Sequence, residues 1–394
     1  MENTVVIKNT AVLLAFFAIV TITSAQTFGS GENPPLIFRG YVKEMPALQF
    51  GKGFTDPSFM NIFQNRLNFR WNITKDLHFA AEGRNMVYYS KMFQNNLIFK
   101  DLLEMDASYF DMSSAWLHEG SWIAHSMVDR LYVDWQQSNW QMRVGRQRIN
   151  WGVNMVSNPN DLFNTYSFFD FDYAERPGTD ALRLQHYFGD MSKAQLAISP
   201  GRKKEEMVAA IMINLNRWNY DFQTLAGYYN NRLALGAGWA GHIGGAGFKG
   251  EATWFYDLKR RAGVKRGNLV AASGVDYMFG SGTFVVLEFL YNGGYKRTPD
   301  KIMLITQPLQ ADNLMFSEFA VTLSAQHPLS TIVQGRLAIM ALPDIEAGFI
   351  MPSISYSVVT NLDLGFVAQI FIGGNDSIFE EAGSSWFASL KYSF

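Results

Sequence analysis

The residues best suited to chemistry in this chain are arginines crowded into one short segment. Arg143, Arg146 and Arg148 fall within a few residues of one another, and a stretch containing Asn158 and Asp161 follows them. A guanidinium is permanently charged and carries only hydrogen-bond donors. The segment therefore predicts one of two arrangements. The arginines either cluster beside a constriction, or they pair with carboxylates and hold a loop in place.

A second candidate is the aromatic and acidic segment 152–179. Its candidate residues for a constriction or a partner-binding loop are Asn158, Asp161, Phe168, Phe169, Asp170, Asp172 and Glu175. Folded into a lumen, the rings would narrow a pore and stack on sugar rings or other flat ligands. In the alternative arrangement, this is an outer loop that packs on its neighbours or forms an aromatic interface for a partner protein. The carboxylates are also the expected partners of the arginines.

The sequence lacks the patterns of an enzyme or a metal centre. The histidines are His78, His118, His125, His186, His242 and His327, and they are scattered without the spacing of a metal site. No serine stands in a Gly-x-Ser-x-Gly setting. Without cysteine, the chain has no thiolate ligand, no disulfide and no lipid anchor on cysteine. We therefore predict no catalytic residue, no metal and no cofactor, and the net charge of −2 does not indicate a nucleic-acid partner.

The composition indicates which elements must position these residues. The chain has 394 residues, of which 48% are hydrophobic, 15% aromatic and 17% charged, so it is too aromatic and too poor in charge for an ordinary soluble protein. A mean hydropathy of −0.05 is also unlike that of a helical membrane protein. A transmembrane β-barrel explains both values, because its strands alternate apolar residues toward lipid with polar residues toward the lumen.

Residues 63–73 show this alternation clearly. Phe63, Leu67, Phe69, Trp71 and Ile73 share one face, whereas Gln64, Arg66, Asn68, Arg70 and Asn72 share the other. Comparable hairpins recur from residues 36–48 to residues 386–394. We predict an all-β fold, a single antiparallel transmembrane barrel of about eighteen strands, with sixteen as the alternative. The connections alternate between short turns and long segments such as 90–124 and 293–315, which predicts short periplasmic turns and long extracellular loops.

Both ends of the chain agree with export to an outer membrane. Residues 1–25 have the pattern of a signal peptide, with Lys8 before an apolar run at 11–22 and small residues before Gln26, so residues 26–394 are expected to form the barrel. The last strand ends on Phe394. It resembles the closing strand of Gram-negative outer-membrane proteins, whose final aromatic residue is read by the barrel-insertion machinery.

The run from Arg143 to Gly152, with the Asn-Pro-Asn-Asp-Leu stretch at 158–162, resembles the strand-and-loop signature of porin-like outer-membrane families, including alginate-export-type barrels of about eighteen strands. The resemblance covers about thirty residues. It implies passive passage of a polar solute through a lumen lined by charges. The Ala25-Gln26 start and the aromatic-rich composition also resemble outer-membrane proteins of Bacteroidota.

Strand phase, with an expected bulge at Gly145, predicts the charges of the lumen. The expected pore-lining residues are Arg66, Arg70, Glu82, Arg84, Arg130, Arg143, Arg146, Arg148, Arg183, Glu251, Glu288 and Arg336. Basic residues gather in the first third of the barrel and acidic residues in the later strands. Such opposed walls would set up a transverse field in a pore. The alternative is that many of these charges form interior ion pairs that keep the barrel rigid.

We therefore expect an outer-membrane channel for passive diffusion of small polar solutes, with anions and saccharides as candidate classes. The alternative is a non-conducting structural barrel that scaffolds partner proteins in an outer-membrane complex. Expected partners are outer-membrane lipid and lipopolysaccharide, the insertion machinery through Phe394, and either further copies of the chain or accessory outer-membrane proteins. The outward faces read as uniformly apolar, with small residues such as Ala209, Ala226, Ala237 and Gly241 that would allow close contact between barrels.

Overall fold

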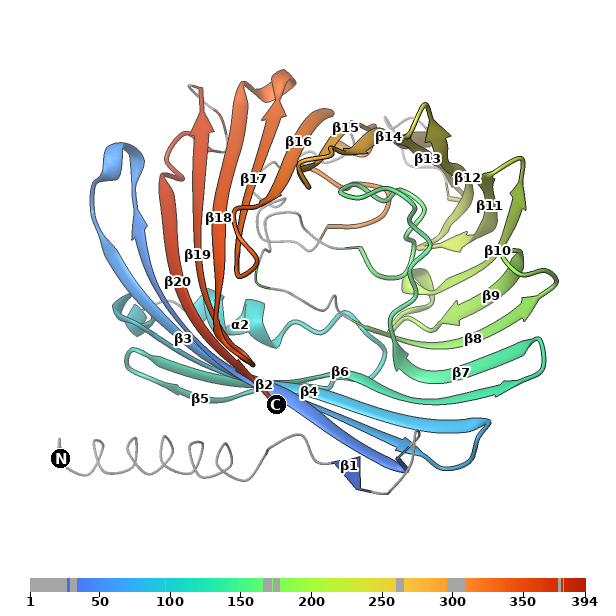
Figure 1. Ribbon diagram of the computed structural model, residues 1–394, viewed down its shortest axis with the longest axis horizontal. Coiled ribbons are helices and arrows are strands. Elements are labelled where there is room, and N and C mark those ends of the chain that lie inside the picture. Colours follow the sequence, from blue (N-terminus) through green and yellow to red (C-terminus); the bar gives the residue numbers. More distant parts are fainter. Residues whose placement is uncertain are drawn as a thin grey trace.

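The structure is a computed structural model and describes residues 27–28, 34–95, 97–165, 172, 178–259, 266–295, 309–374, 377 and 379–394. They form one antiparallel sheet of 20 strands, of which eighteen, β2–β4 and β6–β20, close into a barrel (Figure 1). The predicted barrel of eighteen strands is confirmed. The expected signal peptide at residues 1–25 lies outside the described residues.

The barrel strands alternate in direction around the ring. They are β2 (Leu36–Phe50), β3 (Ser58–Asn72), β4 (Leu77–Ser90), β6 (Trp122–Gln137), β7 (Trp140–Gln147), β8 (Thr179–Tyr187), β9 (Lys193–Ser199), β10 (Val208–Arg217), β11 (Tyr220–Tyr229), β12 (Arg232–Ile243), β13 (Ala246–Asp257), β14 (Gly267–Met278), β15 (Phe284–Asn292), β16 (Phe319–Pro328), β17 (Val333–Leu342), β18 (Ala347–Val359), β19 (Leu362–Gly373) and β20 (Ser384–Ser393). Most extend beyond the ranges expected from the sequence, because pairing continues past the residues that alternate clearly.

Two strands and several short helices are not part of this ring. Strand β1 (Thr27–Phe28) pairs with the start of β2, and β5 (Ser113–Glu119) pairs with residues 122–127 of β6. The helices are η1 (Lys52–Phe54), η2 (Lys91–Asn95), α2 (Leu97–Glu104), η3 (Lys204–Glu206) and η5 (Pro343–Ile345). None of the helices in the described ranges is long and apolar enough to cross a membrane.

Tight turns join the strands at one end of the barrel, and most of the long connections lie at the other. The turn between β10 and β11 is made by Trp218 and Asn219, whose φ angles are 53° and 62°. Two consecutive left-handed residues form the turn that matches the twist of paired strands, so a two-residue connection suffices. At the opposite end, Asn230 and Asn231 make the same kind of turn between β11 and β12, with φ of 47° and 66°.

The C-terminal residue closes the barrel against the first barrel strand. Phe394 donates its N–H to the carbonyl of Gly40 and accepts the Gly40 N–H, both at 2.9 Å. Its ring stacks on Phe38 with centroids 6.2 Å apart. At Gly40 a Cβ atom would lie 2.3 Å from the carbonyl oxygen of Arg66 and 2.8 Å from the Phe394 ring. The seam between β2 and β20 therefore needs a glycine at this position.

The outer surface is mostly apolar, as a barrel in lipid requires. Leu182, Ile211, Leu235 and Phe289 are each more than 40% exposed on the outward phase of their strands. Gly241 also faces outward, but the ring of Tyr220 fills the space beside it, so it does not offer the close approach expected from its size.

The outward face of β3, β4 and β6 departs from the expected uniform apolarity. Ser126 Oγ donates to Asn85 Oδ1 at 2.7 Å, and Asn85 Nδ2 donates to Asn65 Oδ1 at 3.3 Å. Trp116 Nε1 donates to Ser126 at 3.0 Å. The sequence-based expectation was therefore wrong on this sector. Polar side chains are tolerated there because they satisfy one another across neighbouring strands.

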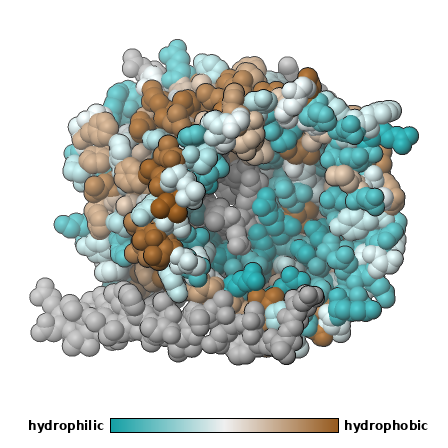
Figure 2. Space-filling model, in the orientation of Figure 1, coloured by the Kyte–Doolittle hydropathy of each residue, from teal (hydrophilic) through white to brown (hydrophobic). Residues whose placement is uncertain are grey.

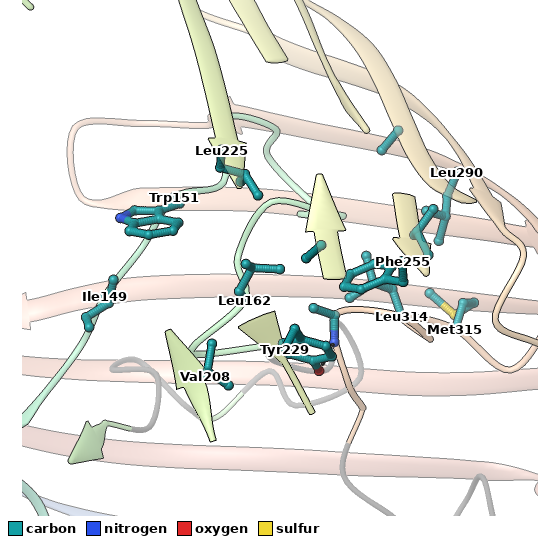
Figure 3. Close-up of a cluster of buried hydrophobic side chains, with 14 of the residues drawn as sticks. Ile149, Trp151, Leu162, Val208, Leu225, Tyr229, Phe255, Leu290, Leu314 and Met315 are labelled. Carbon is teal, nitrogen blue, oxygen red and sulfur yellow. Dashed lines mark hydrogen bonds between the residues drawn. The ribbon is translucent and has the colours of Figure 1, made fainter. Parts of the chain in front are cut away.

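An apolar cluster, which we call the interior cluster, fills one side of the lumen (Figure 3). It combines inward residues of β8–β18 with residues of the three connections that follow β7, β15 and β19. Members labelled in Figure 3 are Ile149, Trp151, Leu162, Val208, Leu225, Tyr229, Phe255, Leu290, Leu314 and Met315. All of them are less than 9% exposed. Part of this barrel is therefore packed like the core of a soluble domain.

We predict that Gly40→Val prevents normal closure of the barrel, because the added side chain would overlap both the Arg66 carbonyl and the Phe394 ring. The measurement is the fraction of protein that runs as the folded, heat-modifiable band after refolding in detergent. Gly280→Ala is the control, since a Cβ there meets nothing within 4 Å. Equal folded fractions for the two variants would show that the seam does not depend on Gly40.

Candidate functional site

The chain leaves the barrel wall at the end of β7 and folds into the lumen. Residues 148–165, which we call the inward loop, run inside the ring of strands (Figure 1). Ile149, Trp151 and Leu162 belong to the interior cluster and are 0%, 2% and 4% exposed. The loop is therefore a packed part of the barrel interior and not a surface connection.

Two carboxylates on the opposite wall hold the backbone of the inward loop, and we call them the carboxylate clamp. Glu251 on β13 accepts the backbone N–H groups of Val153, Asn154 and Asn160 at 3.3, 3.2 and 3.3 Å, and Glu288 on β15 accepts those of Val156 and Ser157 at 3.0 and 2.6 Å. Both side chains are almost fully buried. A buried backbone N–H without a partner costs about 1–3 kcal/mol. The clamp removes this cost for five N–H groups of the inward loop and so stabilises its course inside the barrel.

The clamp changes the interpretation of Glu251 and Glu288, which the sequence predicts as pore-lining residues. They face the interior, as their strand phase indicates, but they lie beneath the inward loop, where its backbone donors need acceptors. Strand phase gives the direction of a side chain and not what covers it, so sequence patterns could not reveal this role.

Asn158 and Asp161, predicted at a constriction, lie in a turn of the inward loop. The Asp161 N–H donates to the Asn158 carbonyl at 3.1 Å, and the two residues are 5% and 0% exposed. Asn160, between them, fixes the turn to the wall. Its Nδ2 donates to the Ala237 carbonyl at 3.2 Å, and its Oδ1 accepts from Thr253 at 2.7 Å. These residues shape the loop and are not themselves exposed to a solute.

Polar side chains occupy parts of the inward face that the interior cluster does not cover. A smaller apolar cluster below α2, which includes Met45, Ile62 and Ile123, covers part of β2, β3 and β6. Figure 2 shows a hollow in the middle of the molecule with hydrophilic side chains gathered along one side of it. A solute crossing the barrel would meet this polar side.

Among the described strand residues, basic side chains predominate on the inward face of β2–β4, β6–β9 and β20. The basic residues are Arg39, Lys43, Arg66, Arg70, Arg84, Arg130, Arg143, Arg183, Lys193 and Lys391, and the acidic residues are Glu82, Asp129 and Asp134. On β10–β19 the order is reversed, with Asp221, Glu251, Asp257, Asp276, Glu288 and Asp363 against Arg232, Lys249 and Arg336. We call the first surface the basic wall.

One part of the basic wall is a buried ion-pair network. Arg66 pairs with Glu82 at 2.7 Å and with Asp129, and Arg84 pairs with Asp129 at 2.9 Å. Arg130 donates to the Asp129 carbonyl oxygen at 2.7 Å. A register shift between β4 and β6 at Glu82 lets Asp129 reach both arginines. These arginines therefore stabilise the wall.

A second part of the basic wall is less balanced. Arg143 on β7 and Arg183 on β8 lie directly opposite each other in the register of the two strands. Arg143 pairs with Asp134 at 2.9 Å, whereas Arg183 donates to the neutral Gln141 Oε1 at 3.1 Å. Like charges in directly opposed positions destabilise a sheet. This pair is therefore the clearest local excess of positive charge on the wall.

Arg146 does not line the pore, contrary to the sequence-based prediction. The register between β6 and β7 shows no shift, so the expected bulge is absent, although Gly145 has a φ of 116°. Arg146 lies opposite outward-facing Leu131, is 3% exposed and pairs with Asp106 at 2.7 Å and Asp180 at 3.1 Å. Without a bulge its phase remains outward, and the connection before β5 covers it.

The electrostatics of Asp106, in that connection, agree with this role. Burial alone would raise the pKa of its carboxyl, but backbone N–H donors and the Arg146 guanidinium outweigh burial and hold the pKa below its usual value. The predicted alternative, in which arginines of this segment pair with carboxylates, therefore applies to Arg146, with partners other than those expected.

The other predicted residues lie in several places. Arg70 donates to Asn72 at 3.0 Å, and Arg336 on β17 donates to Gln334 at 3.0 Å, both as exposed side chains. Arg148 follows the end of β7 and is half-buried at the start of the inward loop. Phe168, Phe169, Asp170 and Glu175 lie outside the described residues.

Asp172 is described, and it reaches the basic wall. Its carboxylate pairs with Lys43 on β2 and accepts from Gln64 Nε2 on β3 at 3.2 Å. Lys43 and Gln64 were not among the residues predicted from the sequence. Their inward phase was the available signal, but nothing in the sequence indicated that a carboxylate from residues 152–179 would meet them.

The part of the chain that the structure describes contains no group of three or more His, Asp or Glu side chains placed to hold a metal ion. Its interior charges occur instead as ion pairs, as hydrogen-bond acceptors for the backbone, and as the arginine pair of β7 and β8.

Comparison with known proteins supports the fold. No protein-family model and no curated protein matches the chain. The outer membrane protein OprD from Pseudomonas aeruginosa superposes with a TM-score of 0.56 at 8% identity, over 94% of this chain and 96% of that chain. OccAB1 from Acinetobacter baumannii gives 0.55 at 10% identity, over 94% and 99%. At these identities the likeness shows a shared outer-membrane barrel fold.

We predict that Glu251→Ala loosens the inward loop, because three buried N–H groups lose their acceptor. If each unpaired donor costs about 1–3 kcal/mol, opening of residues 153–160 becomes at least tenfold more frequent. Hydrogen exchange of these amides, followed by mass spectrometry of the protein in detergent, measures the change. Asp363→Ala removes an inward carboxylate of β19 and is the control. Unchanged protection of residues 153–160 in Glu251→Ala would contradict the clamp.

Proposed function

We propose that this chain forms a porin-like channel in a Gram-negative outer membrane, through which small polar solutes diffuse passively, with a preference for anions. The observation that carries the proposal is the asymmetric lumen. Two glutamates of the acidic strands, Glu251 and Glu288, are buried under the inward loop, whereas basic side chains predominate on the inward face of β2–β4, β6–β9 and β20.

Electrostatics connects this asymmetry to selectivity. Charges on the wall of a narrow channel act on a solute at short range, where screening by salt is weak. The two inward glutamates of β10–β19, Glu251 and Glu288, are buried beneath the inward loop. A solute would therefore meet mostly basic groups, which raise the local concentration of anions.

Saccharides are the other candidate class. They are expected from the aromatic residues of segment 152–179. The aromatic residues that would stack on a sugar ring, Phe168 and Phe169, lie outside the described residues. The basic wall therefore gives stronger support to anions.

We predict steady channels when the folded protein is inserted into a planar bilayer. Under a gradient of potassium chloride, the reversal potential should have the sign of chloride preference, because basic residues predominate along the accessible wall. Cation preference would contradict the anion proposal. Absence of conductance from protein verified as inserted would contradict the channel itself and favour the scaffold alternative.

A further inference from the structure

Arg183, on the basic wall, has a hydrogen-bond donor that no described residue satisfies. Arg183 makes one side-chain hydrogen bond among the described residues, from Nη2 to the neutral Gln141 Oε1 at 3.1 Å. Its Nε, like the Nε of Arg143, has no hydrogen-bond partner in the described part of the chain although each is shielded from solvent. Shielded guanidinium donors are costly to leave unpaired. Each of the two guanidinium groups therefore keeps one unsatisfied donor among the described residues.

The surroundings hold the two guanidinium groups close together. Arg143 lies over the ring of Tyr132, with its central carbon 4.3 Å from the ring centroid, and Nη2 is held by Asp134 at 2.9 Å. Gln141 connects the pair, because its Nε2 donates to both Asp134 oxygens at 3.0 Å while its Oε1 accepts from Arg183. The wall thus orients the arginines before any ligand arrives, which lowers the cost of binding.

The balance of nearby charges leaves room for an anion. Arg143 and Arg183 are like charges in opposed positions of β7 and β8. Asp134 is already engaged by Arg143 at 2.9 Å and by Gln141 at 3.0 Å. Among the described residues, Arg183 therefore has no ion pair of its own with a carboxylate.

The position suits a solute in transit. Arg143 lies four residues before Gln147, where β7 ends and the chain turns into the inward loop. Trp151 of that loop donates to Gln195 of β9 at 2.8 Å, and Gln195 pairs in register with Gln185, two residues from Arg183. The arginine pair thus lies on the barrel wall close to the N-terminal end of the inward loop.

We infer that Arg143 and Arg183 form a binding subsite for a small oxyanion, such as the phosphate or carboxylate group of a solute. This inference rests on the proposed channel and names the group that its wall recognises. A guanidinium presents paired N–H donors that match two oxygens of one anion, and two such groups side by side suit an oxyanion better than a halide. Chloride would pass, whereas an oxyanion would be held briefly.

The test uses inorganic phosphate as the probe and the full-length protein in a planar bilayer. With chloride carrying the current, added phosphate should reduce single-channel current in a saturable way. Arg183→Gln should weaken this block by at least about tenfold, the effect of removing a charge-assisted hydrogen bond. Arg183→Lys keeps the positive charge but loses the paired N–H donors of the guanidinium, so it should also weaken the block. Acetate in place of phosphate distinguishes carboxylate binding from phosphate binding.

The control is Arg217→Gln, which removes one positive charge from the outward phase at the end of β10 and should leave the block unchanged. The folded band on a gel confirms that each variant forms a barrel. Normal chloride current with no block by phosphate or acetate would overturn the subsite and leave the channel standing. Equal block in the wild type and in Arg183→Gln would also overturn it. Absence of any current would instead overturn the proposed channel.

Discussion

The interior of this barrel depends on one requirement, that a chain leaving the wall must find acceptors for its backbone donors. The wall satisfies its own N–H groups through pairing, but residues 148–165 give up that pairing when they turn inward. Glu251 and Glu288 supply the missing acceptors, and Asn160 adds contacts of its own with the wall. Without these groups, the backbone N–H groups of the loop would be buried without acceptors, and the loop would be more stable in water.

Once the clamp fixes the loop, apolar burial follows from it. Trp151 and Leu162 are carried against the inward side chains of strands that would otherwise face water, and the interior cluster forms around them. The lumen becomes lopsided as a result. Glu251 and Glu288 of the later strands are buried beneath the inward loop, whereas Arg143 and Arg183 of the early strands are only part-buried. Charge asymmetry along the sequence thereby becomes charge asymmetry across the lumen.

The sequence predicted the barrel strands better than the contacts inside the barrel. The physical reason is that strands have a two-residue period that can be recognised in a sequence. Alternation at residues 63–73 gives the phase of β3, and the same pattern repeated along the chain predicts eighteen strands. Contacts between a loop and a distant strand have no period. Nothing in the sequence paired Glu288 with the backbone of Ser157, 131 residues away, or Arg146 with Asp106. Arg146 shows the limit, because its phase was read correctly as outward and then reversed by an expected bulge that does not form.

The arginines of the barrel differ in what surrounds them, and that difference separates structure from function. Arg66, Arg84 and Arg146 are buried, and each has a carboxylate at contact distance, as a buried cation must. Arg183 is only part-buried, and its hydrogen-bond partner is a neutral amide. A fold under selection only for rigidity would gain by replacing it with a neutral residue, because Arg143 opposes it directly. In the proposed subsite, a bound oxyanion would offset the repulsion between Arg183 and Arg143.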